Sequence, residues 1–314
     1  MPSFGDRRAR ELEVIVPAST SNLGPGFDFL GLALSLPLRV RAAIDLRASR
    51  DALGALEGTA ASWPSSADNL LLRAFAVARE RLAIDAPPVR FDVRSEIPVA
   101  RGLGSSGAAV AAGLVLGNAL AARKAPIDEL LAWGLELEGH PDNASASLLG
   151  GCTLSVPLAA GGVRVVQQPL SDALGFVLAW PASVLETSAA RRVLPANVPL
   201  AHAVENPRRL ALLLEGLRTG DPELLSLGGE DRLHVQHRLP LIPGGAAALE
   251  AARARGAWLA TVSGSGSALI ALGAHTQVES IGAAMRGELE RASGDAWHRV
   301  VRPVFGAPLV REIA

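Results

Sequence analysis

A glycine-rich segment directly before a predicted helix is the strongest candidate for chemistry in this sequence. It runs from Pro98 to Ala108, has glycines at positions 102, 104 and 107, and leads into an Ala- and Leu-rich run that continues to about Ala122. Glycines in such a turn let backbone N–H groups approach an anion, and the helix N-terminus adds about half a positive charge. Ser105 and Ser106 add hydroxyls that can contact phosphate oxygens or a metal ion. The segment therefore predicts a phosphate-binding loop.

The glycine spacing in this loop also fits the fingerprint of dinucleotide-binding folds. Those folds place an acidic ribose ligand about 20 residues further on, but Arg123 and Lys124 occupy this region and Asp128 falls in a predicted helix. The P-loop pattern Gly-x-x-x-x-Gly-Lys-Ser/Thr does not occur in the sequence. A nicotinamide-dependent dehydrogenase is therefore kept only as an alternative.

Two further loops combine glycine with polar residues, one near each end of the sequence. Pro17–Asp28 is long for a simple connection, and Thr261–Ser267 overlaps the end of a predicted strand. Together with Pro98–Ala108, they resemble the three signatures of the GHMP kinases (galactokinase, homoserine kinase, mevalonate kinase and phosphomevalonate kinase), in the same order. Ser267 departs from the proline that the family often has there. The resemblance implies ATP and Mg²⁺ as cofactors.

The resemblance also implies the fold, which is of the α+β class. It is the two-domain GHMP kinase fold, with ATP and substrate in the inter-domain cleft. The 314 residues fit two domains better than one. We place the boundary near residue 160, with an N-terminal, ATP-binding domain at residues 1–160 and a C-terminal domain at residues 161–314.

Other segments resemble the homoserine kinase branch of this family. Glu136–Asn143 contains Glu-Gly-His-Pro-Asp-Asn, and Glu186–Arg191 and Val235–Gly244 are similar to two further segments of that branch. The sequence departs at Ser145–Ser147, where the branch has Val-Ala-Pro, and at Gln236–His237, where it usually reads Glu-Pro-x-Arg. The resemblance implies transfer of the ATP γ-phosphate to the side-chain hydroxyl of L-homoserine, a step toward threonine.

The resemblance assigns roles to individual residues. The expected nucleotide-binding residues are Asn69, Pro98, Val99, Ala100, Arg101, Gly102, Leu103, Gly104, Ser105, Ser106, Gly107 and Ala108. The expected metal ligands are Ser106 and Glu138. The expected substrate-binding residues are Asn22, Asp28, His140, Arg191, Arg238 and Gly264, and the expected catalytic residues are Asn143, His140 and Thr187.

The residue types suit these roles. Glu138 follows Leu135 by three residues, so a helix would aim its carboxylate along an apolar face, where a charge is costly unless it is paired or binds a metal. Homoserine is a zwitterion, and Asp28 supplies an anion for its ammonium group. Arg191 and Arg238 supply forked donors for its carboxylate. The plainer interpretations are a helix-end salt bridge for Glu138 and surface positions for the arginines.

Asn143 occupies the position where some GHMP kinases have a catalytic aspartate. An amide cannot act as a base, so we predict that Asn143 and His140 orient the acceptor hydroxyl and that the neighbouring Asp142 is structural. The sequence places no group of chemically matched residues around His202, His234, His275 or His298.

Hydrophobic periodicity predicts the elements that must position these residues. Strands are expected at residues 11–16, 38–46, 89–93, 163–166, 176–180 and 259–262. Helices are expected at residues 69–82, from the phosphate loop to about 122, and at 126–139, 188–194 and 207–217. Thr187 and Arg191 are four residues apart and would share one helix face.

The composition fits a globular protein without a nucleic-acid footprint. Apolar residues make up 49% of the sequence and the formal net charge is −1. We interpret Arg7, Arg8 and Arg10 as a solvated cluster. The single cysteine, Cys152, excludes an internal disulfide and favours a reducing cytosol, and Phe27–Leu38 is too short to cross a bilayer. We expect a cytoplasmic protein without nucleic-acid or membrane partners, and the family resemblance adds a homodimer.

Three alternatives to a homoserine kinase are open at this point. Another GHMP kinase could act on an isoprenoid precursor or a sugar, but the Glu-Gly-His-Pro-Asp-Asn segment argues against it. A dehydrogenase lacks its ribose ligand. A catalytically silent nucleotide-binding member would be free to lose Glu138 and Ser106, and both are present.

Overall fold

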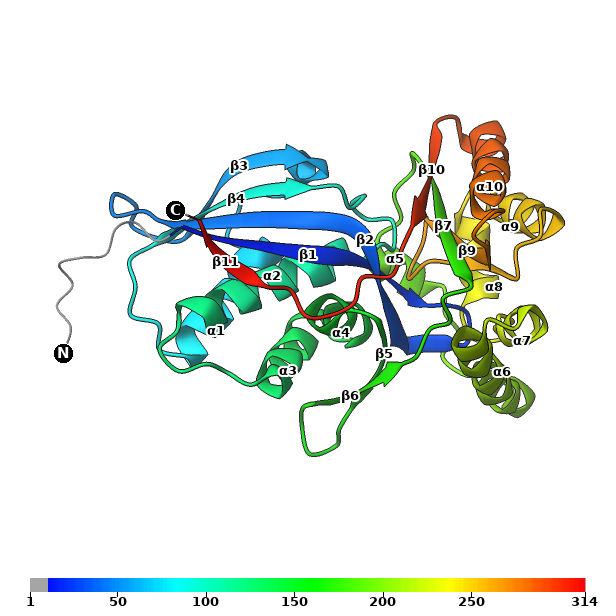
Figure 1. The fold of residues 1–314 in the computed structure, drawn as a ribbon, viewed down its shortest axis with the longest axis horizontal. Coiled ribbons are helices and arrows are strands. Elements are labelled where there is room, and N and C mark those ends of the chain that lie inside the picture. The colour runs from blue at the N-terminus through cyan, green and yellow to red at the C-terminus, as the bar shows by residue number, and fades with distance from the viewer. Residues whose placement is uncertain (1–10, 314) are drawn as a thin grey trace.

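The computed structural model describes residues 11–313 (Figure 1). The predicted arginine cluster at residues 7–10 lies outside these residues. The described chain forms two sheets with helices packed on them, which confirms the expected α+β class.

The larger sheet has seven strands in the order β11-β1-β2-β4-β3, and β5 pairs with both β2 and β6. Its pairs are antiparallel except that β3 runs parallel to β4. The strands are β1 (Glu11–Asn22), β2 (Gly26–Ile44), β3 (Ala52–Gly58), β4 (Val89–Ser95), β5 (Cys152–Pro157), β6 (Val163–Gln168) and β11 (Val310–Ile313).

One face of this sheet carries the main core. Leu12, Val14 and Val16 of β1 are buried, whereas the residue before each of them is more exposed, the period of two expected of a strand. Figure 1 shows the helices that cover this face on one side of the long strands. They are α1 (Leu70–Arg81), α2 (Ser105–Leu120), α3 (Ile127–Glu138) and α4 (Asp142–Leu149).

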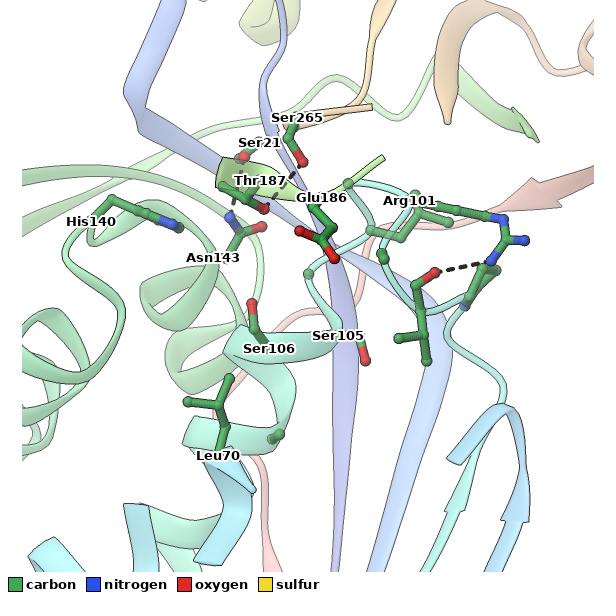
Figure 2. Close-up of a pocket in the computed structure, with 18 of the residues that line it drawn as sticks. Ser21, Leu70, Arg101, Ser105, Ser106, His140, Asn143, Glu186, Thr187 and Ser265 are labelled. Carbon is green, nitrogen blue, oxygen red and sulfur yellow. Dashed lines mark hydrogen bonds between the residues drawn. The ribbon is translucent and has the colours of Figure 1, made fainter. Parts of the chain in front are cut away.

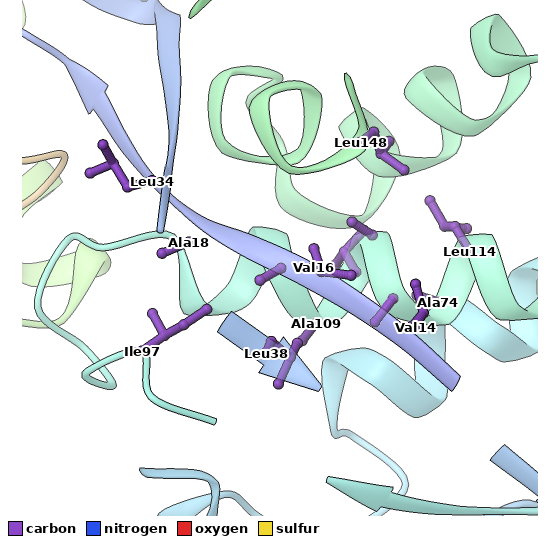
Figure 3. Packing of buried hydrophobic residues seen from close by; sticks show 14 of the residues in the cluster. Val14, Val16, Ala18, Leu34, Leu38, Ala74, Ile97, Ala109, Leu114 and Leu148 are labelled. Carbon is purple, nitrogen blue, oxygen red and sulfur yellow. The ribbon is translucent and has the colours of Figure 1, made fainter. Parts of the chain in front are cut away.

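Helix α2 is the centre of this core. It contacts β1, α1, α3 and α4, and every residue from Gly107 to Leu114 is buried, as expected of a helix that is apolar all round. Figure 3 shows Ala109 and Leu114 of α2 packed near Val16 and Leu148. This packing holds the first turn of α2 in a fixed place at the end of the helix layer.

The smaller sheet has four antiparallel strands in the order β10-β7-β9-β8. Helices α9 and α10 pack against it, and α6 and α7 pack on each other (Figure 1). Its strands are β7 (Leu174–Pro181), β8 (Leu259–Val262), β9 (Leu269–Ala274) and β10 (Ala296–Val301). The remaining helices are α5 (Thr187–Arg192), α6 (Leu200–Thr219), α7 (Pro222–Gly228), α8 (Val235–Arg238), α9 (Gly245–Ala254) and α10 (Val278–Ser293), with short 3₁₀ turns η2 (Thr59–Ser62) and η3 (Leu239–Leu241).

The predicted helices and strands are found, with some changes of length. Helix α3 begins after Pro126 and ends at Gly139, which has φ +79°, as the proline and glycine signals indicate. Helix α6 was expected to begin at Pro207, but it begins at Leu200, so the proline lies inside it. The loop expected at Pro17–Asp28 is shorter, because β1 continues to Asn22 and β2 begins at Gly26.

The sheets do not divide the chain at residue 160. Strands β6 and β11 both follow that position and both belong to the larger sheet. A division by sheet membership therefore falls after Gln168, and the last strand returns to the first sheet. Between residues 11 and 313, no helix combines the length and apolarity that a membrane crossing needs.

Candidate active site

One cavity of about 340 Å³ lies where the three glycine-rich loops meet. Its wall also includes the N-terminal end of α1, the link from α3 to α4, and residues of α5 and α8. Figure 2 shows Ser105 and Ser106 at the start of α2, with Asn143, Thr187 and Ser265 on the opposite side of the cavity. Segments that are far apart in the sequence thus line one cavity.

The predicted phosphate loop connects β4 to α2. Gly104 is the N-cap of α2 with φ +67°, and a Cβ there would lie 2.0 Å from Ser19 Oγ, so a side chain does not fit. The amide of Ala108 donates to Gly104 O, whereas the amides of residues 105–107 precede the first intrahelical bond and have no partner within the helix. Ser105 and Ser106 line the cavity. The helix end is therefore suited to an anion.

The dinucleotide-binding alternative does not hold for this topology. In a dinucleotide fold, the helix after the glycine loop leads to a neighbouring strand parallel to the one before it. Here α2 is followed by α3, α4 and then β5, which pairs with β2 and β6 and not with β4.

Hydrogen bonds tie the three loops to one another. The Ser263 hydroxyl donates to Gly102 O (2.7 Å) and lies 2.8 Å from Thr20 Oγ1, so one side chain contacts all three loops. Arg101 uses its guanidinium for three backbone carbonyl oxygens, those of Val99, Pro181 and Ala182. The guanidinium of Arg101 therefore connects the phosphate loop to the end of β7.

An ion pair occupies another side of the cavity. Arg191 on α5 donates two parallel hydrogen bonds to Asp28, from Nη1 to Oδ2 (2.9 Å) and from Nη2 to Oδ1 (2.8 Å). The hydrogen bond to Asp28 raises the pKa of Arg191. The two side chains are 38% and 35% exposed, so solvent screens the pair and its net contribution to stability is small. Asp28 and Arg191 can therefore give up their bonds to each other and bind the ammonium and the carboxylate of a zwitterionic ligand.

Arg238 lies deeper, with only 2% of the residue exposed. Its Nη1 donates to Gly264 O (3.0 Å) and its Nε to Ala190 O (3.4 Å). The guanidinium carbon lies 5.1 Å from the ring centroid of Phe27, a cation–π distance. Burial lowers the pKa of Arg238. The Phe27 ring and the two carbonyl oxygens therefore take the place of the water molecules that would surround this guanidinium at the surface.

Asn22 connects the first loop to the third. Its Nδ2 donates to Gly264 O (2.9 Å), and its Oδ1 accepts from the backbone N–H of Asp28 (3.0 Å). Asn22, Leu23, Asp28 and Ala100 have φ between +48° and +72°, and they are four of the five non-glycine residues with positive φ in the described chain. Each such residue costs about 1–3 kcal/mol and persists only where its surroundings enforce it. The strain is thus concentrated in the first two loops of the site.

Asp142 organises the two predicted catalytic side chains. Its Oδ1 lies 2.7 Å from His140 Nδ1 and accepts from the backbone N–H (2.8 Å) and Nδ2 (3.1 Å) of Asn143. Burial would raise the pKa of Asp142, but the hydrogen bond and charge of His140 hold it below its usual value. Burial would lower the pKa of His140, but the hydrogen bond and charge of Asp142 raise it. Because Asp142 is buried and already used by its neighbours, this geometry favours the predicted structural role.

Glu138 lies at the end of α3, behind Ser106. Its Oε2 is buried and has no hydrogen-bond partner. Burial raises the pKa of Glu138 to about 7, although the charge of His140 and the Ser106 hydroxyl oppose this. An orphaned carboxylate oxygen beside a hydroxyl is the hard oxygen donor set that Mg²⁺ prefers. The residues present therefore fit the implied metal ion. Among the described residues, no cluster of three or more His, Cys, Asp or Glu side chains could hold a metal, so Glu138 would be the main protein carboxylate in such a site.

The buried carboxyl predicts a pH dependence of stability in the ligand-free protein. The pKa of Glu138 is about 7 in the folded protein and 4.5 without perturbation, so between these pH values the folded state holds a proton that the unfolded chain has released. The free energy of unfolding must then fall as the pH rises through this window, by up to roughly 3 kcal/mol at about 1.4 kcal/mol per pKa unit. Urea unfolding without nucleotide or divalent cations, from pH 5 to pH 8, should show this fall in the unaltered protein. The fall should be smaller in Glu138→Gln, where only other groups such as His140, whose pKa is also raised, still contribute to it, and equal slopes for the two proteins would contradict the assignment.

Most of the predicted site residues do line the cavity. These are Asn22, Asp28, Asn69, the loop residues from Pro98 to Ser106, His140, Asn143, Thr187, Arg191, Arg238 and Gly264. Asn69 is also the N-cap of α1, accepting from the backbone N–H of Leu71. The structure places Gly107, Ala108 and Glu138 behind the wall, because the first turn of α2 packs against α4 there.

The departures from the homoserine kinase segments lie outside the cavity. Ser145 and Ser147 are buried in α4, and the Ser147 hydroxyl donates to Pro17 O (3.3 Å). Gln236 and His237 lie on α8, where their side chains contact each other. The departures therefore leave the residues around the cavity unchanged.

Some residues of the wall were not predicted. Ser265, Glu186 and Leu70 lie next to predicted residues, so their segments were a usable signal, but no pattern marks Trp63. The expectation that nothing surrounds His234 is wrong: its ring contacts Gly24, Phe27 and Arg238. The spacing of four between His234 and Arg238 could have indicated their contact. The other lining residues that were not predicted are Ser21, Pro64, Asp68, Ala109 and Asp142.

Family models and curated relatives of this chain point to the same protein family. Residues 69–151 match the GHMP kinases N terminal domain, and residues 213–291 match the GHMP kinases C terminal family. The chain is 40% identical to a homoserine kinase of Prochlorococcus marinus (strain MIT 9313) over 90% of this chain and 89% of that protein. It is 41% identical to a homoserine kinase of Thermosynechococcus vestitus over 87% and 90% of the two chains.

Solved structures agree with this. A crystal structure of homoserine kinase from Cytophaga hutchinsonii superposes with a TM-score of 0.87 at 26% identity, covering 99% of each chain. A mevalonate kinase from L. major, at 13% identity and a TM-score of 0.69 over 96% of this chain and 98% of that one, shares the fold. Sequence, cavity and comparisons together show that the chain belongs to the homoserine kinases of the GHMP kinase family.

Proposed function

We propose that this protein transfers the γ-phosphate of ATP to the side-chain hydroxyl of L-homoserine, giving O-phospho-L-homoserine on the route to threonine. The observation that carries the proposal is one cavity with an anion-binding helix end on one side and Asp28, Arg191 and Arg238 on another. Homoserine kinase relatives at 40–43% identity support it.

The nucleotide side of the proposal rests on the loop before α2. The free amides of its first turn and the hydroxyls of Ser105 and Ser106 suit the phosphate groups of ATP. Ser263 and Arg101 hold the loop in place, so little ordering is needed when the nucleotide binds. Glu138 and Ser106 would hold a magnesium ion, which neutralises charge on the phosphate groups.

The substrate side rests on charge complementarity. Homoserine carries one ammonium and one carboxylate, which match Asp28 and the two arginines. Arg191 is already held in a forked geometry by Asp28, and that geometry is also the one that binds a carboxylate. A sugar or isoprenoid alcohol lacks the ammonium group and would leave Asp28 without a new partner.

We expect catalysis by orientation, without an aspartate base. The Asn143 amide is fixed by Ser19, whose hydroxyl donates to Asn143 Oδ1 (2.9 Å), and by Asp142. His140 is fixed by Asp142 as well. In a loose transition state the hydroxyl needs little activation, so its proton can pass late to the transferred phosphoryl group.

This mechanism predicts a difference between two neighbouring substitutions. Asn143→Ala should lower kcat more than Asp142→Asn. Asn143 is the residue that would contact the homoserine hydroxyl, so its loss removes the orienting group. In Asp142→Asn, the amide oxygen can still accept hydrogen bonds from His140 and from the backbone N–H of residue 143. The measurement is steady-state kcat for both variants, with circular dichroism as the control for folding. A loss of about 10²–10⁴-fold confined to a well-folded Asp142→Asn would identify a general base and contradict the mechanism.

The function itself is tested by ADP release from ATP and magnesium with a panel of acceptors. We expect turnover with L-homoserine and none with mevalonate or galactose, and threonine and serine serve as amino-acid controls of hydroxyl position and chain length. Turnover on mevalonate or galactose, with none on homoserine, would replace this proposal by another activity of the family.

A further inference from the structure

The side chain of His234 is fully buried between the first loop and α8. Its Nε2 lies 2.9 Å from Gly24 O, and its Nδ1 lies 3.3 Å from Arg238 Nη1. Its ring stacks on Phe27, with ring centroids 5.0 Å apart and planes 26° apart. One imidazole thus joins the tip of the β1–β2 hairpin to the buried arginine of the cavity.

The two partners define the tautomer of this imidazole. A backbone carbonyl only accepts, so Nε2 must carry the hydrogen, and a guanidinium only donates, so Nδ1 must present its lone pair. A protonated ring would set an N–H donor and a positive charge directly against Arg238. The geometry therefore requires a neutral His234 with hydrogen on Nε2.

The groups around His234 shift its pKa in opposite directions. Burial lowers the pKa of His234, and so does the Arg238 guanidinium, whereas the carboxylates of Asp231 and Asp28 oppose the change. Asp231 Oδ1 lies 3.9 Å from Nε2, too far for a hydrogen bond. The net effect is a lowered pKa of His234, which favours the neutral ring that the contacts require.

The segment that carries His234 is itself held rigidly. Asp231 Oδ2 accepts from the backbone N–H groups of Leu233 (3.1 Å), His234 (2.7 Å) and Val235 (2.7 Å). Asn206 of α6 donates to Asp231 Oδ1 (3.1 Å). The imidazole is therefore placed by its backbone and does not need Arg238 to hold it.

Arg238 in turn has two of its three guanidinium nitrogens committed. Nη1 contacts His234 and Gly264 O, and Nε contacts Ala190 O. Among the described residues, none makes a hydrogen bond to Nη2, and Arg238 lines the cavity. The guanidinium is thus held by one edge, with its remaining nitrogen left for a ligand.

We propose that His234 is a positioning residue for substrate binding: its neutral imidazole ties Arg238 to the first loop and fixes the guanidinium for the carboxylate of the amino-acid substrate. This rests on the proposed function, because homoserine supplies that carboxylate. His234 acts through Arg238 and does not itself touch the substrate.

Two substitutions separate positioning from packing. His234→Leu removes both polar contacts at similar volume and leaves a guanidinium donor unpaired, so the KM for homoserine should rise by about ten- to a hundredfold. The KM for ATP should stay unchanged. In His234→Asn, the amide oxygen can replace Nδ1 as the acceptor for Arg238, and much of the homoserine affinity should return. His237→Leu, three residues further on in α8, partly exposed and outside the cavity lining, is the matched control and should have normal KM values.

The opposite results would overturn the proposal. An unchanged homoserine KM in His234→Leu would do so, and so would equal losses for ATP and homoserine without rescue by His234→Asn, which is the behaviour of a packing residue.

A measurement on the unaltered protein separates this proposal from the proposed function. ¹⁵N NMR of histidine-labelled protein, with the His234 signal assigned through His234→Asn, should show the neutral Nε2–H tautomer at pH 7. An imidazolium or the Nδ1–H tautomer would refute the proposal, even if neither variant folds. A missing turnover of homoserine by the unaltered protein would instead count against the proposed function.

Discussion

Replacing Glu138 with Gln is expected to lower kcat by roughly a hundredfold to ten-thousandfold. The carboxylate would hold the magnesium ion, whose charge stabilisation is worth several kcal/mol, and each 1.4 kcal/mol is about tenfold in rate. Glutamine keeps the shape and the buried position but not the charge. ADP release with homoserine, measured over a range of magnesium concentrations, should show both the loss of kcat and a weaker response to magnesium.

A control for this substitution lies two residues away on α3. Glu136 is exposed and pairs with Arg81 at the surface, so Glu136→Gln should leave kcat and the magnesium dependence unchanged. Misfolding is not expected to confuse the result, because removing a buried charge should make Glu138→Gln more stable above pH 7 than the unaltered protein. A fully active Glu138→Gln with normal magnesium dependence would show that Glu138 is only a structural carboxylate.

The second large effect is expected at the two arginines of the cavity. Arg191→Ala and Arg238→Ala should each lower kcat/KM for homoserine by about ten- to a hundredfold, because a charge-assisted hydrogen bond is typically worth about 1.5–3 kcal/mol. The KM for ATP should change little. Steady-state kinetics with each substrate varied in turn measures this difference. Lysine at either position keeps the charge but not the fork, so it should recover only part of the loss.

The two arginines should differ in their effect on folding. Arg191 is partly exposed, and its loss leaves Asp28 able to reach water. Arg238 is buried, and its loss leaves Gly264 O with one partner fewer, so Arg238→Ala should also unfold at lower urea concentration. Arg192→Ala is the control, because Arg192 follows Arg191 on α5 but is exposed and outside the cavity. Losses of ATP affinity as large as those for homoserine would move the arginines to the nucleotide side.

Local patterns in the sequence predicted the elements that position the site. Helix α3 could be placed from Pro126, its apolar spacing and Gly139, and α5 (Thr187–Arg192) was predicted close to its place, at residues 188–194. The phosphate loop could be placed because glycine, serine and a helix start have a local physical role. These features need only neighbouring residues, so the sequence displays them directly.

Contacts between distant segments could not be predicted in the same way. The pairing of Asp28 with Arg191 joins residues 163 positions apart, and nothing in either segment shows that the two predicted ligand groups face each other. The same holds for the hydrogen bond from Arg101 to Pro181 O at the end of β7. It also holds for the pairing of β11 with β1, which joins the two ends of the described chain. The cytoplasmic location and the homodimer stay predictions from the sequence.

The position of the transferred phosphoryl group is the most direct measurement of the proposed activity. With L-homoserine, magnesium and ATP labelled with ¹⁸O in its γ-phosphate, ³¹P NMR and mass spectrometry should find O-phospho-L-homoserine in an amount equal to the ADP formed. The three terminal oxygens should carry the label, and the bridging oxygen should come from homoserine. ADP formation with labelled inorganic phosphate and no phosphorylated amino acid would contradict a homoserine kinase. So would phosphorylation of mevalonate or galactose, each offered instead of homoserine, if homoserine itself is not phosphorylated.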